Sequence, residues 1–171
     1  QIVLGLLMGH IYQELINLKE LHGLKNLCGF FSRRIFMECT IYLAEGCNLK
    51  CTYCYEGIDK KTGKMDIRTF DQTLAFIMKN RVENDKIHIV FLGGEPLLNK
   101  PLFFYAINKI NSDYKEIRDQ FKLEMTTNGV FLDDNVIKVV KEENINLSLS
   151  IDGEEHTQKR NRRSVYGDDT F

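Results

Sequence analysis

The hydrophobic positions of the chain change their period several times between residues 36 and 153. Short runs rich in β-branched and apolar residues, typical of buried strands, alternate with segments whose apolar residues recur every three or four positions, as on one face of a helix. Asp66 is a typical N-cap, and Pro101 suits the first turn of a helix. We expect strands at 36–44, 86–94, 121–129 and 145–153, with helices at 66–81, 100–111 and 133–143.

This order of elements predicts the fold class. Strands that alternate with helices of this length are joined by right-handed crossovers and form a parallel sheet. The expected architecture is therefore α/β, with one main domain over residues 36–171. In such folds ligands bind at the carboxyl ends of the strands.

The preceding segment, residues 1–35, is expected to be a helical extension. Leu15, Leu18 and Leu21 form an apolar stripe that ends at Gly23, which suits a helix packed on the main domain. A remnant of a partner-binding domain is the alternative. The apolar start of the chain is too short to span a bilayer and lacks the basic region of a signal peptide.

Composition narrows the class of partner and the compartment. The net charge of −1 over 171 residues gives no electrostatic indication of a nucleic-acid or membrane partner. Five cysteines, three of them within eight residues, are untypical of a secreted disulfide framework. We expect a reducing, cytoplasmic location and a metal site built from these three thiolates.

Cysteine, glycine and polar residues typical of binding sites follow each predicted strand. Because the carboxyl ends of parallel strands meet at one edge, four separate loops should converge on a single rim. The four segments are Cys47–Cys54, Gly93–Pro96, Thr126–Gly129 and Ser150–Gly153.

Three thiolates can bind zinc or an iron–sulfur cluster. A structural zinc site requires a fourth ligand, for which Cys28 or Cys39 could serve, although Cys39 would lie several residues down the first strand, away from the loop. A cubane cluster held by three thiolates instead leaves one iron open, and an open metal position is typical of catalytic sites.

The stretch "CNLKCTYCY" at 47–55 carries three cysteines in the spacing CxxxCxxC, with an aromatic residue before the last of them. Together with "GGEP" at 93–96 it resembles the radical S-adenosylmethionine enzymes, over residues 36–171. The resemblance implies a partial (βα)6 TIM-like barrel of which four units are visible. It also implies a [4Fe–4S] cluster ligated by Cys47, Cys51 and Cys54.

The same resemblance implies the reaction. S-adenosylmethionine would bind the open iron. An electron from a one-electron reductant such as flavodoxin or ferredoxin would cleave it to a 5′-deoxyadenosyl radical, which abstracts hydrogen from the substrate. The cofactors thus supply the difficult chemistry, and the protein positions and shields them.

The resemblance also suggests cofactor-binding residues, each with a structural alternative. Tyr53 would lie beside the adenine, or only pack the loop. Gly93, Gly94 and Glu95 would meet the methionine amino group, or form a tight turn. Asn128 would be a polar contact, or part of a turn. The fourth strand would supply ribose contacts from Ser150 and Asp152, although Asp152 could cap a helix. No catalytic residue is assigned.

The wider motifs "GGEPLLN", "TTNG" and "SIDGEEHTQKR" are similar to the peptide- and protein-modifying branch, which includes anaerobic sulfatase maturases and thioether-forming maturases with a SPASM-type extension. This predicts a peptide or protein substrate. The alternatives are a radical activase or a cofactor-biosynthesis enzyme and, in another class, a non-catalytic metal-binding peptide-docking module.

In that branch the segment that corresponds to "SIDGEEHTQKR" commonly has the pattern DGxxxxHDxxR. We assign the His and Arg of this pattern to His156 and Arg160. We expect Arg160, Arg162 and Arg163 to form a solvated basic face of a helix, and pairing with a carboxylate is the alternative. Because only four of six strands are visible, we expect this chain to be part of a longer protein and inactive by itself.

Overall fold

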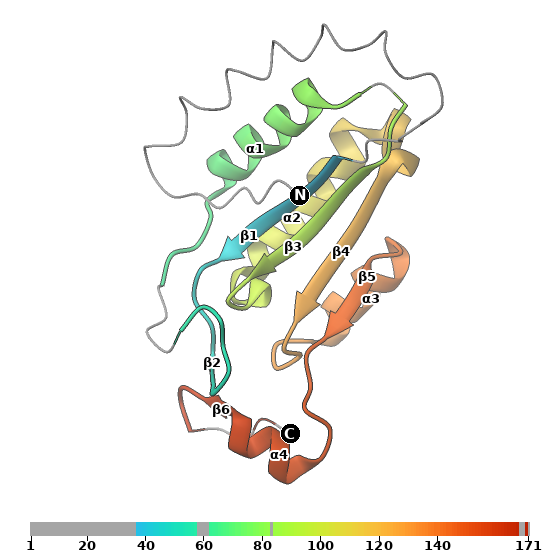
Figure 1. Ribbon diagram of the computed structural model, residues 1–171. Coiled ribbons are helices and arrows are strands. Elements are labelled where there is room, and N and C mark those ends of the chain that lie inside the picture. Colours follow the sequence, from blue (N-terminus) through green and yellow to red (C-terminus); the bar gives the residue numbers. More distant parts are fainter. Residues whose placement is uncertain (1–36, 58–61, 83, 168–169, 171) are drawn as a thin grey trace, which may run out of the picture.

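The computed structural model describes residues 37–57, 62–82, 84–167 and 170 (Figure 1). Its elements in chain order follow the predicted alternation closely. They are β1 (Met37–Ala44), β2 (Leu49–Cys51), α1 (Ile67–Asn80), β3 (Ile87–Gly93), the 3₁₀ helix η2 (Pro96–Asn99), α2 (Lys100–Asp113), the 3₁₀ helix η3 (Lys115–Gln120), β4 (Phe121–Thr127), α3 (Asp134–Glu142), β5 (Asn146–Leu149), α4 (Glu155–Asn161) and β6 (Arg162–Ser164).

The main sheet has four strands in the order β1-β3-β4-β5, and every neighbouring pair is parallel. The predicted α/β class is therefore confirmed. In Figure 1 the arrowheads of all four strands point toward the end of the molecule that carries β2, β6 and α4. The strand β5 is shorter than expected, because the chain leaves the sheet after Leu149.

One face of the sheet carries the hydrophobic core. Ile87, Ile89 and Phe91 of β3 are fully buried and alternate with half-buried residues, the period of two expected for a strand packed on one side. Buried residues of α1, α2 and α3 join them in one continuous cluster. The helices begin as predicted, since Asp66 accepts from Thr69 N at 2.7 Å to cap α1.

A second, two-stranded sheet was missed by the sequence analysis. β2 and β6 pair antiparallel, with Leu49 opposite Ser164 and Cys51 opposite Arg162. The pairing is extended by hydrogen bonds from Thr52 N to the Asn161 carbonyl and from Val165 N to the Asn48 carbonyl, at 2.8 and 2.9 Å. Strands of three residues are too short to show a hydrophobic period, so the pattern contains no sign of them.

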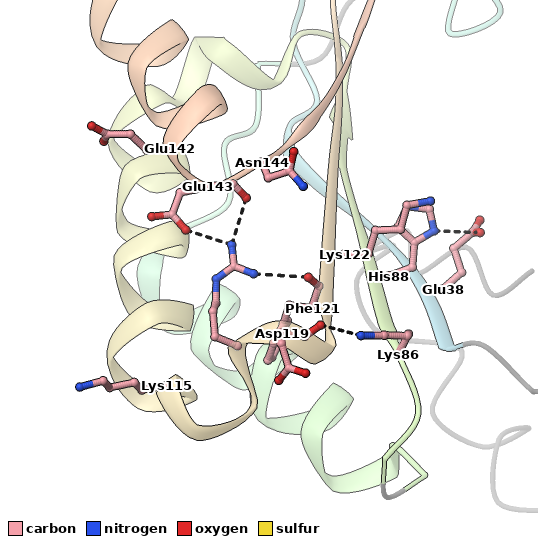
Figure 2. Close-up of a pocket in the computed structure, with 11 residues that line it drawn as sticks. Glu38, Lys86, His88, Lys115, Asp119, Phe121, Lys122, Glu142, Glu143 and Asn144 are labelled. Atoms are coloured by element: carbon pink, nitrogen blue, oxygen red, sulfur yellow. Dashed lines mark hydrogen bonds and ion pairs between the residues drawn. The ribbon is translucent and has the colours of Figure 1, made fainter.

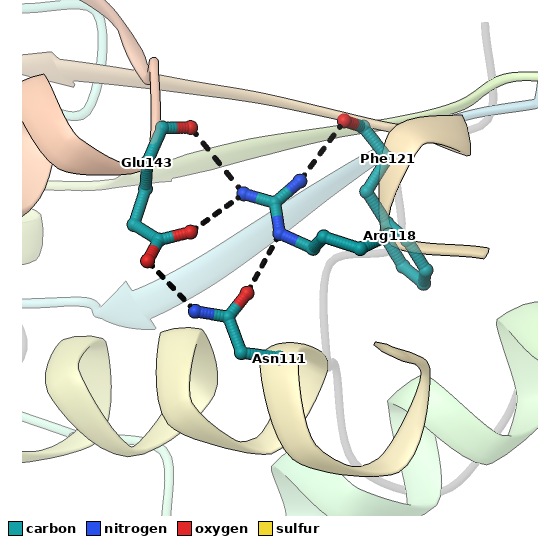
Figure 3. Close-up of polar contacts among 4 residues, drawn as sticks. All are labelled: Asn111, Arg118, Phe121 and Glu143. Carbon is teal, nitrogen blue, oxygen red and sulfur yellow. Dashed lines mark hydrogen bonds and ion pairs between the residues drawn. The ribbon is translucent and has the colours of Figure 1, made fainter. Parts of the chain in front are cut away.

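The end of the sheet opposite β2 and β6 is held by Arg118 (Figure 3). Its guanidinium donates to Asn111 Oδ1 at 2.7 Å, to Glu143 Oε2 at 2.9 Å, and to the carbonyls of Phe121 and Glu143 at 3.3 Å. Asn111 Nδ2 in turn donates to Glu143 Oε1 at 2.8 Å. This network joins α2, η3 and the turn after α3.

The predicted helical extension, residues 1–35, lies outside the described residues. Within the described part of the chain, helices are all too short or too polar to cross a bilayer.

Candidate cofactor site

The loop after β1 carries Cys47, Cys51 and Cys54, which are half-buried and form no disulfide within the described part of the chain. The loop follows an irregularity in β1, where the pairing register shifts between Tyr42 and Ala44. Among the described residues, His, Cys, Asp and Glu side chains do not gather three or more around a single metal ion. A cubane cluster meets each cysteine at a different iron, so its ligands are spread around the cluster rather than directed at one point.

Gly93 and Gly94 bring the end of β3 against the start of this loop. Gly94 N donates to the Ala44 carbonyl at 3.0 Å. A Cβ on Gly93, which has φ of +150°, would lie 2.1 Å from the Ala44 oxygen, and one on Gly94 would lie 2.4 Å from the Gly46 oxygen. The two glycines are therefore required by the approach of the chain to itself. Their contact with the methionine amino group stays a prediction.

Glu95 is a buried anchor between two strand ends. Only 1 % of the residue is exposed. Its Oε1 accepts from Leu97 N at 3.0 Å and from Thr127 Oγ1 at 2.7 Å, and its Oε2 accepts from Asn128 N at 2.8 Å. Burial raises the pKa of Glu95, although these hydrogen bonds oppose the effect. Because donors of the chain itself occupy both oxygens, the carboxylate first of all ties β3 to β4.

Asn128 connects this anchor to the cysteine loop. Its Oδ1 accepts from Val130 N at 3.0 Å. Its Nδ2 donates to Asn48 Oδ1 at 2.9 Å and lies 3.7 Å from Cys47 Sγ. The turn alternative also holds, since Gly129 follows with φ of +85°. Asn128 is thus both a turn residue and a polar contact, and the contact observed is with the cysteine loop.

Three side chains link the cysteine loop to the segment after β5, and we refer to Tyr53, Asp152 and Arg162 as the Tyr53 clasp. The Tyr53 hydroxyl donates to Asp152 Oδ1 and accepts from Arg162 Nη1 at 2.6 Å. Arg162 Nη1 also lies 3.6 Å from Asp152 Oδ1, and its guanidinium carbon is 5.9 Å from the Tyr53 ring centroid. The Tyr53 hydroxyl, with Asn161 and Arg162, holds the pKa of Asp152 below its usual value.

The expectation of a solvated arginine face is wrong for Arg162. Arg160 and Arg163 are exposed, but Arg162 lies in β6 with 8 % of the residue exposed. Its Nε is buried and has no hydrogen-bond partner among the described residues. A buried donor without a partner is costly in a native protein and suits a site that a ligand completes.

The assignment of the motif residues to His156 and Arg160 is also wrong. Counted from Asp152, the His and Arg of DGxxxxHDxxR fall on residues 158 and 162. The structure places Gln158 inward, where its Oε1 accepts from Asp152 N at 3.0 Å, whereas His156 is exposed. Correct counting of the motif is the signal that would have identified Arg162.

The segment after β5 joins the rim through its main chain. Ser150 N donates to the Thr127 carbonyl at 2.9 Å. Helix α4 begins at Glu155, and its cap residue is Glu154 without a side-chain bond. The helix-capping alternative for Asp152 is therefore wrong. With this segment in place, all four loops meet at the carboxyl ends of the strands, as predicted.

A hollow of about 1070 Å³ lies at the other end of the sheet (Figure 2). His88 forms one wall, with its Nδ1 3.3 Å from Glu38 Oε2 and its Nε2 3.2 Å from Glu124 Oε2. The lining carries charges of both signs, including Lys86, Lys122 and Glu143. It does not include the cysteines, so the predicted chemistry is not located there.

Comparison with known proteins identifies the superfamily to which the chain belongs. The model of the Radical SAM superfamily matches residues 41–170. The chain belongs to this superfamily, which uses a [4Fe–4S] cluster and S-adenosylmethionine (AdoMet).

Two named proteins of this superfamily are similar to the chain over part of their length. The chain is 29 % identical over 136 residues to the cysteine-type anaerobic sulfatase-maturating enzyme of Clostridium perfringens, covering 75 % of this chain and 36 % of the enzyme. It is 34 % identical over 115 residues to the GTP 3′,8-cyclase of Clostridium botulinum, covering 64 % of this chain and 33 % of that protein. The chain thus spans about a third of the length of these relatives.

Solved structures confirm the fold. Native anSMEcpe with bound AdoMet matches with a TM-score of 0.69 at 27 % identity, over 80 % of this chain and 37 % of that one. Native anSMEcpe with bound AdoMet and Cp18Cys peptide matches with a TM-score of 0.68, over 79 % of this chain and 36 % of that one. The predicted partial radical SAM barrel is therefore confirmed, and the solved structures that match it belong to an enzyme of the peptide-modifying branch to which the sequence motifs are similar.

The residues at the rim fit such a cofactor pair. One loop offers three thiols. Leu49 N and Asn128 Nδ2 lie 3.3 and 3.7 Å from Cys47 Sγ, and N–H donors directed at a thiolate are the usual surroundings of an iron–sulfur ligand. The Nε of Arg162, which has no partner among the residues that the structure describes, is a buried donor suited to an anionic or carbonyl group.

Proposed function

We propose that the protein to which this chain belongs is a radical SAM maturase acting on a peptide or protein. The observation that carries the proposal is the meeting of the cysteine loop with three other strand-end loops at one rim. Cys47, Cys51 and Cys54 would ligate the cluster, and AdoMet would bind at the remaining iron. When bound, this pair supplies one-electron cleavage of the sulfonium to methionine and a carbon radical that takes hydrogen from the substrate.

The chain's own residues have defined roles in this proposal. The Tyr53 clasp and the β2–β6 pairing hold the cysteine loop in place against the segment after β5. Gly93, Gly94 and Asn128 would line the AdoMet side of the rim, with Tyr53 toward the adenine. Ser150 and Asp152 would face the ribose. Glu95 would act mainly as the buried anchor of the rim.

Support for a peptide substrate comes from the relatives. The C. perfringens relative is a sulfatase-maturating enzyme, and an anSMEcpe structure holds a peptide together with AdoMet. The electron would come from a one-electron carrier such as flavodoxin or ferredoxin. A cofactor-biosynthesis enzyme is the second candidate, because the GTP 3′,8-cyclase of C. botulinum matches at a higher identity over a shorter stretch.

The test is anaerobic reconstitution of the longer protein with iron and sulfide, followed by reduction in the presence of AdoMet. We expect iron and sulfide in cubane ratio and formation of 5′-deoxyadenosine. Replacing Cys47, Cys51 and Cys54 together by Ala should abolish both. Cys39→Ala is the matched control, because Cys39 is buried in the core of β1 and should leave the cluster intact.

Two comparisons within this experiment separate the candidates. Cysteine- or serine-containing peptides should stimulate 5′-deoxyadenosine formation more than GTP does, whereas the reverse would favour the cyclase-like candidate. Zinc at one ion per chain, without iron, would contradict the enzymatic proposal and favour a metal-binding docking module.

A further inference from the structure

The side chain of Asn128 faces the sulfur of the first cysteine from a neighbouring strand end. Its Nδ2 is 3.7 Å from Cys47 Sγ, and 9 % of the residue is exposed. The adjacent acceptor, Asn48 Oδ1, is also buried and receives a hydrogen bond from the same Nδ2 at 2.9 Å. This contact joins residues that are far apart in the sequence and belong to two different loops of the rim.

The hydrogen-bond network determines which end of the Asn128 amide faces Cys47. The Val130 main-chain N–H donates to Asn128 Oδ1 at 3.0 Å, and an N–H can only donate to the oxygen end. The Nδ2 end is therefore directed at Cys47. The main chain of Asn128 is fixed as well, because its N–H donates to the buried Glu95 carboxylate at 2.8 Å.

We propose that Asn128 is a positioning residue that donates a hydrogen bond to the Cys47 thiolate and thereby raises the reduction potential of the bound cluster. The inference rests on the proposed function, since it requires the cluster. Reduction adds one electron from an external carrier, and the added negative charge is shared by the cysteine sulfurs. An N–H donor at a sulfur stabilises that charge, and such hydrogen bonds are among the factors that set cluster potentials.

A second donor points to the same sulfur. Leu49 N lies 3.3 Å from Cys47 Sγ, but it is a main-chain group of β2 and side-chain substitution does not remove it. Asn128 is thus the side chain through which the potential can be changed. It also explains why a buried amide, rather than an apolar residue, follows β4 at this point.

The experiment compares Asn128→Leu and Asn128→Asp, which keep the approximate shape of the side chain. Leu removes the donor, and Asp places a carboxylate toward the sulfur. The measurement is the midpoint potential of the reconstituted cluster, from a redox titration followed by electron paramagnetic resonance, together with iron content. We expect potentials in the descending order wild type, Leu variant, Asp variant, with iron content unchanged.

Asn146→Asp is the matched control. It introduces the same change of charge on β5, where Asn146 contacts Glu124 and not the cysteine loop, so its potential should equal that of the wild type. Equal potentials in all three Asn128 forms, with full iron content, would overturn the inference. Failure of the wild type to take up iron would instead contradict the proposed function.

A measurement on the wild type keeps the inference testable if a variant loses its cluster. Protein labelled with nitrogen-15 in its asparagine side chains should show a nitrogen-15 coupling to the reduced cluster in pulsed resonance spectra. Absence of this coupling in iron-loaded wild type would overturn the inference.

Discussion

Arg162 holds Tyr53 by two contacts at once: its Nη1 donates to the Tyr53 hydroxyl at 2.6 Å, and its guanidinium carbon lies 5.9 Å from the ring centroid. The two residues are 109 positions apart in the sequence. Tyr53 therefore adds a side-chain connection to the main-chain pairing of β2 with β6, the last described strand.

Tyr53→Phe should weaken the Tyr53 clasp without removing it. The ring stays, but the hydroxyl that bridges Asp152 and Arg162 is lost. We expect a decrease of about 1 kcal/mol in the free energy of unfolding, measured in urea on the metal-free protein. Tyr166→Phe makes the same change at an exposed tyrosine and should have no measurable effect. Equal effects of the two changes would contradict the clasp.

Gly94→Ala should disturb the start of the cysteine loop. The added Cβ would overlap the carbonyl oxygens of Gly46 and Glu45, at 2.4 and 2.8 Å, and neither main-chain atom can move without displacing the loop. We expect destabilisation of about 1–3 kcal/mol and reduced iron uptake. Gly153→Ala is the control: its positive φ alone should cost about 1 kcal/mol, and open space around it should leave iron uptake unchanged.

Arg118→Met should loosen the opposite end of the sheet. The change leaves Asn111 and the Glu143 carboxylate without their shared donor, and we expect a loss of about 2 kcal/mol in the free energy of unfolding. The urea midpoint is the measurement. Lys115→Met, in the same 3₁₀ helix but outside this network, should change the midpoint little. Iron uptake should be unaffected by either substitution, since both lie far from the rim.

Asp133 should make the free energy of unfolding depend on pH in the acid range. A hydrogen bond from Lys100 and the capping bond from Val136 N lower the pKa of Asp133. A carboxyl whose pKa is lowered on folding stabilises the protein above its unfolded pKa, about 3.9, and this contribution is lost as the pH falls through the lower folded value.

The measurement for Asp133 is the difference in unfolding free energy between wild type and Asp133→Asn as a function of pH. Asn still caps helices well, so the variant isolates the charge. We expect the difference to be constant near neutral pH and to shrink below about pH 4. A difference independent of pH would contradict the role of the Lys100 contact.

Local and periodic features were predictable from the sequence. Asp66 and Asp133 cap helices through contacts with residues three positions away, so the pattern near each of them is sufficient. The approach of Asn128 to Cys47 was also within reach, because parallel strands bring their carboxyl ends to one edge whatever the intervening distance.

The position of Arg162 depends on contacts with residues far away in the sequence. Its strand has three residues and shows no period, and its partners, Tyr53 and Cys51, are supplied by a loop from the other end of the described chain. The three neighbouring arginines look alike in composition, and the count of the DGxxxxHDxxR motif is the sequence signal that separates Arg162, which the pairing of β2 with β6 buries, from the other two. Likewise, the glycines at the end of β3 suggested an approach to a ligand, which stays a prediction, and the structure adds their approach to Ala44 and Gly46.

The antiparallel pairing of Cys51 with Arg162 has a consequence for biosynthesis. A ribosome delivers the three cysteines before the strand that completes their loop, which is translated more than a hundred residues later. The ligand loop therefore lacks its β6 partner until residues 162–164 have been translated, however quickly the neighbouring strand folds. Iron and sulfide delivered before residue 165 has emerged would meet flexible thiols, so productive loading of the metal centre should follow synthesis of this segment rather than accompany it.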